Sequence, residues 1–117
     1  MIESYRDLIV WQKSITMVKI VYKATKNFPL EERFGLLSQI RRSAVSIPSN
    51  IAEGKSRGTR KDYGRFLQIA FGSGAELETQ ILIAHQLGYI GDGHFEIITR
   101  HISEIMRMLN TLIHRLK

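Results

Sequence analysis

The sequence of 117 residues contains no cysteine, which excludes disulfide bonds and thiol chemistry and makes a reducing cytoplasm the expected location. No uncharged apolar run approaches the ~18 residues that a membrane-spanning helix requires. The start of the chain, residues 1–4, lacks the basic and apolar segments of a signal peptide. We therefore expect a cytoplasmic protein that makes no contact with a membrane.

Patterns that signal catalysis or metal binding are also missing. None of the four histidines lies at the four-residue helical spacing of a metal-binding pair, and no Glu-x-x-His motif occurs. Gly72-Ser73-Gly74 is not followed by the Gly-Lys-Ser/Thr of a phosphate loop. Glu53 and Glu76 can be interpreted as paired catalytic carboxylates, but a structural role is favoured. We expect a protein that is not an enzyme and that holds no metal and no cofactor.

Four amphipathic segments account for most of the chain, because apolar residues recur at spacings of three and four and no alternating strand pattern appears. We predict helices over about 5–26, 30–53, 60–87 and 93–116. Their short connections favour an all-α, up-down-up-down four-helix bundle that forms one domain over residues 1–117. The first and second helices have wide stripes, and the surplus apolar and small-polar surface predicts an oligomer. The stripe of the first helix holds Leu8, Trp11, Ile15, Val18, Tyr22 and Thr25, with Ile9, Met17 and Val21 beside them.

Capping signals predict where the helices begin and end. Short polar residues stand at three expected N-cap positions: Ser4, Thr59 and Asp92. Pro29 suits the first turn of the second helix, and Gly54 suits its C-terminal end.

The segment Ile40–Gly54 is unusual because a helical projection gives it two distinct faces. One face is apolar, whereas the middle of the other holds the short polar residues Ser46, Ser49 and Asn50. Such residues let another helix approach closely, so we infer one packing face within the subunit and one between subunits. A solvent face that is rich in serine is the alternative. Pro48 predicts a kink, and one of the three polar side chains is expected to bond the carbonyl that the proline frees.

Gly72 and Gly74 stand in the middle of the third predicted helix, where each costs ~1 kcal/mol relative to alanine. We infer a close approach to the polar face of the second helix; a break between two shorter helices is the alternative. Glu76 follows within one turn and is expected to pair with Arg41 or Arg42 across the helices. The polar residues assigned a structural or oligomer-interface role are Ser46, Ser49, Asn50, Glu53 and Glu76.

Positive charge is concentrated in one window of the sequence. The chain has a net charge of +6, and residues 41–65 alone hold seven basic and two acidic side chains, a net +5. An anionic partner is the natural interpretation, RNA or DNA first, although a basic loop without a partner also fits. The cations predicted to bind nucleic acid are Arg41, Arg42, Lys55, Arg57, Arg60, Lys61 and Arg65.

One set of motifs extends over almost the whole chain, from about residue 5 to residue 113. The motifs are Val10-Trp11-Gln12, Phe28-Pro29, Glu32 to Leu36, Gln39 to Arg42, Ser46 to Gly54, Tyr63 to Leu67 and Leu87-Gly88-Tyr89. Together they resemble the 23S rRNA intervening-sequence protein family, whose bacterial members are named for reading frames inside insertions in 23S rRNA genes.

The resemblance implies a four-helix bundle that assembles as a ring, with a homopentamer expected. A related branch is the accessory variability protein of diversity-generating retroelements, a basic pentameric barrel associated with a reverse transcriptase and with nucleic acid. The resemblance carries over no catalytic residue. The recurring family positions present in this sequence are Arg41, Ser46, Asn50, Glu53 and Gly54.

Three functional hypotheses follow. The first is a non-catalytic homo-oligomer that binds nucleic acid, structured RNA before DNA, mainly through phosphates. The second is a protein-interaction scaffold whose basic face docks an acidic partner, such as a polymerase-like enzyme. The third is a passenger protein with no defined host role.

Overall fold

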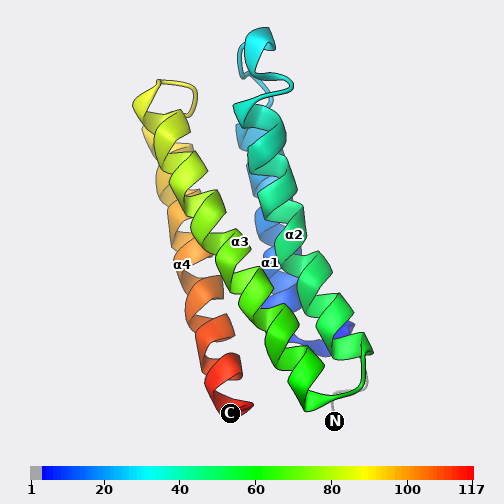
Figure 1. The fold of residues 1–117 in the computed structure, drawn as a ribbon. Coiled ribbons are helices and arrows are strands. Elements are labelled where there is room, and N and C mark those ends of the chain that lie inside the picture. The colour runs from blue at the N-terminus through cyan, green and yellow to red at the C-terminus, as the bar shows by residue number, and fades with distance from the viewer. Residues whose placement is uncertain (1–3) are drawn as a thin grey trace.

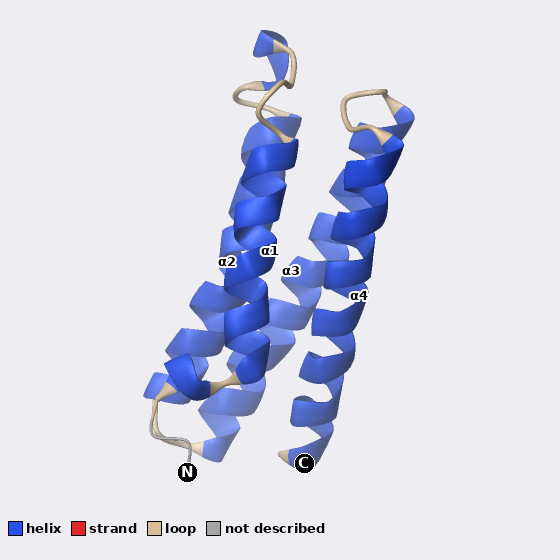
Figure 2. Ribbon diagram, turned by 180° about the vertical axis from the view of Figure 1, so that it is seen from behind, coloured by secondary structure: helices blue, strands red, loops and turns tan. Residues whose placement is uncertain are grey.

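The computed structural model describes residues 4–117, and these residues form four α-helices and no β-strand (Figure 1). The helices are α1 (Ile9–Ala24), α2 (Leu36–Ser56), α3 (Arg60–Gln86) and α4 (Asp92–Arg115), with short 3-10 helices η1 (Tyr5–Asp7) and η2 (Leu30–Glu32). They run alternately up and down, so α1 begins at the end of the bundle where α4 finishes, as Figure 2 shows from behind. The predicted all-α four-helix bundle is confirmed. No helix among residues 4–117 is long and apolar enough to span a membrane.

The first helix begins later than predicted, and its buried face matches the prediction only in part. Ser4 and Asp7 form the predicted capping box, but they cap η1 rather than α1. The buried residues of α1 are Val10, Ser14, Met17 and Val21. Of the predicted stripe, Leu8 and Thr25 are buried and Trp11 and Val18 pack partly buried against the core, whereas Tyr22 is 41% exposed. Met17 and Val21, predicted beside the stripe, are fully buried. Apolar residues cover so much of this helix that their spacing alone does not determine which of them lie at the centre of the buried face.

The second helix differs from its prediction at both ends. Residues 30–32 form the separate helix η2, because Gly35 takes a non-helical backbone conformation (φ −111°, ψ −116°) just before Leu36. The helix then continues through Pro48 and ends at Ser56, so the predicted stop at Gly54 is wrong. Gly54 instead lies buried within the helix, where α2 and α3 approach closely. A Cβ at this position would lie only 2.7 Å from the Cβ of Phe66 on α3, so the approach requires glycine.

The third helix is continuous through Gly72 and Gly74, as predicted, and Thr59 caps it by accepting a hydrogen bond from the N–H of Asp62. Only Gly74 lies in a close approach, since its added Cβ would lie 3.0 Å from Cγ of Met106 on α4. Gly72 faces open space. The prediction that these glycines pack against α2 is wrong, because the helix turns them toward α4 and toward solvent.

The fourth helix begins at Asp92, but Asp92 is not its N-cap as predicted. Gly91 holds that position without a side-chain hydrogen bond. The Asp92 carboxylate lies 2.7 Å from Nε2 of His85 near the end of α3, and the His85 ring stacks on Phe95 at a centroid distance of 4.0 Å. The carboxylate therefore joins the ends of two helices rather than capping its own.

A contact between two connections closes the same end of the bundle. The Tyr89 ring lies 5.3 Å from the ring of Phe28, and its hydroxyl donates a hydrogen bond to Oε2 of Glu32 at 3.2 Å. The other oxygen of Glu32 accepts from the N–H of Leu36 at 3.0 Å, at the first residue of α2. Burial and the Glu32 carboxylate both raise the pKa of Tyr89.

The core is one cluster of apolar side chains from all four helices. Each helix packs against two neighbours, and α1 and α3 lie diagonally opposite, as do α2 and α4. The largest fully buried side chains are Val10, Met17, Ile40, Ile47, Ile51, Leu67, Leu77, Ile81, Ile98, Ile102, Ile105 and Leu109. This core fixes the directions in which the charged side chains of α2, α3 and α4 project.

Candidate nucleic-acid interface

The seven predicted cations do not form one continuous band. The 21 residues of α2 span about 30 Å, with Arg41 and Arg42 near the start and Lys55 near the end. The others lie in the α2–α3 connection and the first turns of α3: Arg57, Arg60, Lys61 and Arg65. The window of sequence therefore divides between two parts of the molecule, because most of the length of α2 separates them.

The larger group is joined by two cations that the sequence reasoning missed. Nη2 of Arg60 donates a hydrogen bond to the carbonyl of Arg115 at 2.9 Å, and Arg60 and Lys117 line the same hollow. Arg115 follows Arg60 by 55 residues, and only the antiparallel return of α4 brings them together. We call this group the basic end: Lys55, Arg57, Arg60, Lys61, Arg65, Arg115 and Lys117.

Aromatic rings of α3 hold three of these cations. The guanidinium carbons of Arg57 and Arg65 lie 5.0 Å and 4.9 Å from the centroid of the Phe66 ring, and Nζ of Lys55 lies 5.3 Å from that of Tyr63. Burial raises the pKa of Tyr63, whose hydroxyl has no hydrogen-bond partner within residues 4–117. Cations already occupy these rings, so they position charge rather than offer open faces for stacked bases.

Two acidic side chains lie among the seven cations. Glu53 pairs with Arg57, with 3.1 Å between Oε2 and Nε, and Asp62 lies in the first turn of α3. Lys55 is partly buried, and the other cations of the basic end are exposed. Exposed guanidinium and ammonium groups of this kind bind phosphate oxygens. Within the described residues, no group of three histidine or carboxylate side chains is placed to hold a metal ion.

Arg41 and Arg42 are adjacent in sequence but differ in environment. Nε of Arg41 donates to Oγ1 of Thr25 at 3.1 Å, Nη2 donates to the carbonyl of Tyr22 at 3.3 Å, and the guanidinium lies 4.4 Å from the centroid of the Tyr22 ring. Arg42 is exposed. The predicted ion pair of either residue with Glu76 is wrong, since none forms in the chain from 4 to 117 and Arg41 is drawn to α1 instead.

The polar residues of α2 contact α3 within the subunit. The hydroxyls of Ser46 and Ser73 lie 2.8 Å apart, and the Asn50 amide donates to both the carbonyl and the hydroxyl of Ser46. Asn50 therefore bonds the Ser46 carbonyl, not that of Ala44, which Pro48 frees. The remaining residues predicted for this face are exposed: Ser49, Glu53 and Glu76.

The fold and the charge distribution define a small all-α protein, a four-helix bundle with a strongly basic end. The model of the 23S rRNA-intervening sequence protein family matches residues 6–111, and the chain belongs to this family. The resemblance found in the sequence motifs is thereby confirmed.

Among the solved structures that share this fold, one has 31% sequence identity to this chain and a TM-score of 0.79. It is a crystal structure of a protein of unknown function from the S23 ribosomal protein family of Bacteroides thetaiotaomicron, and the match covers 90% of this chain and 98% of that one. Among proteins with curated descriptions, none matches the chain.

Proposed function

We propose that this protein is a non-catalytic nucleic-acid-binding protein that contacts phosphates through the basic end. The observation that carries the proposal is the convergence of seven cations from α2, α3, α4 and the residues next to them at one end of the bundle, with Glu53 and Asp62 among them. RNA is tested before DNA in this proposal because the family is named for insertions in 23S rRNA genes, a name that gives the place of the genes and no ligand.

The geometry favours recognition of phosphates over recognition of bases. Cations already lie over the faces of Phe66 and Tyr63, so base stacking on these rings contributes little. Binding through phosphates alone carries little sequence information and weakens steeply with salt. The expected ligand is therefore a folded RNA with closely spaced phosphates rather than a defined sequence.

Charge reversal tests this assignment. Lys61→Glu combined with Arg65→Glu reverses two exposed charges at the basic end. Arg100→Glu combined with Arg107→Glu is the matched control, because it changes the net charge equally on the exposed surface of α4. We expect the first pair to weaken binding of a 23S rRNA stem-loop about 100-fold, and the control pair less than about 5-fold. Equal losses of affinity in the two pairs would show that binding depends on net charge alone, and would refute the basic end as the site.

We further propose a ring-shaped homo-oligomer. The number five rests on the family resemblance, and the exposed aliphatic side chains of α3 support association. Ile69, Leu82 and Ile83 of α3, and Leu87 directly after it, are 42% to 56% exposed. A ring would repeat the basic end in each copy and add its phosphate contacts. Light scattering should give five times the chain mass of 13.5 kDa, and a monomer would contradict the proposal.

A further inference from the structure

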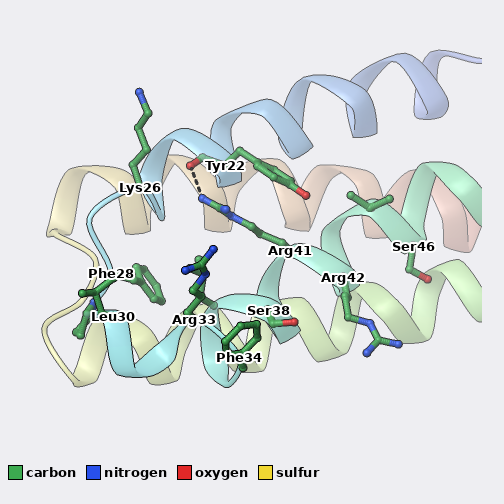
Figure 3. A pocket seen from close by; sticks show the side chains of 13 residues that line it. Tyr22, Lys26, Phe28, Leu30, Arg33, Phe34, Ser38, Arg41, Arg42 and Ser46 are labelled. Carbon is green, nitrogen blue, oxygen red and sulfur yellow. Dashed lines mark hydrogen bonds between the residues drawn. The ribbon is translucent and has the colours of Figure 1, made fainter.

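A groove lies between the end of α1, the η2 turn and the first half of α2 (Figure 3). Its volume is about 790 Å³, and 13 residues line it. Four of them are cations and none is a carboxylate: Lys26, Arg33, Arg41 and Arg42. Only Arg41 and Arg42 belong to the basic window of the sequence, and the groove is separated from the basic end by about 20 Å along α2.

Two guanidinium groups occupy the middle of the groove. In Figure 3, Arg33 and Arg41 point into the space between α1 and the η2 turn, whereas Lys26 and Arg42 project outward. Arg41 is held in place by its hydrogen bonds to Thr25 and to the Tyr22 carbonyl. These bonds use the Nε and Nη2 edge of the guanidinium, so its Nη1 group is the part left to donate to a carboxylate. The groove thus has excess positive charge that no acidic side chain lining it offsets.

The surface beside these cations is apolar and exposed. Phe34 is 90% exposed, Leu30 is 86% exposed and Val45 is 39% exposed. Large apolar side chains gathered on a projecting turn are typical of an interaction surface. A helix that presents apolar side chains one turn apart would bury these residues and leave its flanking positions beside the cations.

We infer that this groove docks an acidic amphipathic segment of a partner protein. The apolar side chains of that segment pack against Phe34 and Leu30, and its carboxylates bind Arg33 and Arg41. Nucleic acid fits less well, because Arg41 covers the Tyr22 ring and the exposed side chains beside Phe34 are the aliphatic Leu30 and Val45. Aliphatic side chains such as Leu30 give bases no stacking surface. The inference goes beyond the proposed function, since it adds a protein-binding site apart from the basic end.

A displayed library of helical peptides of about three turns, randomised on one face, is the probe. The library is selected on the wild-type protein and depleted on the Phe34→Ser, Arg33→Glu double variant, whose substitutions lie at exposed positions. We expect the enriched peptides to share large apolar residues one turn apart, flanked by Asp or Glu. A synthetic peptide of that consensus should lose about 10-fold or more in affinity with either single variant.

Matched controls and a charge exchange complete the test. Ile97→Ser and Arg100→Glu repeat the two substitution types on α4, where both residues are exposed, and should change affinity less than about 2-fold. Replacing Glu by Lys in the peptide should restore its binding to the Arg33→Glu variant.

Three results would overturn the inference. The first is an absence of enriched peptides, or a consensus without acidic residues. The second is an effect of Phe34→Ser on the binding of single-stranded oligouridine, which would make nucleic acid the occupant. The third is a lower mass in solution for Phe34→Ser, which would make a second copy of the chain the occupant. All three readouts are independent of the stem-loop measurement that tests the basic end.

Discussion

At Gly54, α2 and α3 approach so closely that an added Cβ would lie 2.7 Å from the Cβ of Phe66 and 3.3 Å from the carbonyl oxygen of Tyr63. Gly72 also lies in a helix interior, but nothing lies within 4 Å of the corresponding position. Substituting alanine at Gly54 therefore measures the steric cost of a side chain, and substituting alanine at Gly72 measures the difference in helix propensity alone.

Gly54→Ala is expected to lower the free energy of unfolding by about 1 to 3 kcal/mol, because the added methyl group must push α2 and α3 apart. Gly72→Ala should raise it by about 0.5 to 1 kcal/mol, the usual gain of alanine over glycine in a helix. Urea denaturation followed by circular dichroism measures both. Equal shifts of the same sign would show that the helices do not approach as closely as described.

The adjacent residues Arg41 and Arg42 allow a second comparison. Arg41→Lys keeps the charge but loses the paired hydrogen bonds to Thr25 and Tyr22, so we expect a loss of about 1 to 2 kcal/mol in the free energy of unfolding. Arg42→Lys should stay within about 0.5 kcal/mol, because Arg42 is exposed. Thermal or urea unfolding measures the free energy of unfolding of both variants. An equal change in the two would mean that Arg41 does not link α1 to α2.

At the scale of the element, the existence and order of the helices followed from apolar spacing, whereas their ends did not. Glycine is a residue type that often ends a helix, but Gly54 lies inside α2 at its close contact with Phe66 of α3. Local sequence does not reveal that contact. Aspartate is likewise a residue type that often caps a helix, but the Asp92 carboxylate contacts His85 instead. The same residue types serve as local signals and as tertiary contacts, so spacing predicts the helices better than their boundaries.

The Tyr89–Glu32 hydrogen bond ties the α3–α4 connection to the start of α2 and makes the stability pH-dependent. Burial first, and then the Glu32 carboxylate, raise the pKa of Tyr89 in the folded protein. An unfolded tyrosine ionises near pH 10. The stabilisation from this contact is therefore complete below about pH 10 and is lost as the pH rises through the higher folded pKa.

Ultraviolet titration of the tyrosines tests this contact. Glu32→Gln should move the Tyr89 transition toward the ordinary value, because the charge that opposes ionisation is removed. Tyr89→Phe should delete that transition and make stability less dependent on pH above about 10. Tyr63, whose pKa is raised by burial alone, should stay high in both variants and acts as an internal control. An unchanged Tyr89 titration in Glu32→Gln would exclude the carboxylate as a cause.

At the scale of the whole molecule, the sequence indicated a basic window but not its shape. Arg41 lies in the same window as Lys61, yet α2 carries it to the other end of the bundle. Arg115 lies far away in sequence, yet α4 returns it to Arg60. The amino-acid composition alone gives the net charge. Where the charged side chains cluster depends on the directions in which the long helices run, and apolar spacing does not give these directions until the connections are known.

The measurement that tests the central claim most directly is the affinity for a 23S rRNA stem-loop and for a matched DNA duplex across a salt series. Phosphate binding at the basic end predicts tight binding to the RNA, weaker binding to the duplex, and a slope of log affinity against log salt of about −4 or steeper. Lys61→Glu with Arg65→Glu should make that slope shallower by about 2. Equal and weak binding to both nucleic acids, with a slope that these substitutions leave unchanged, would contradict the account.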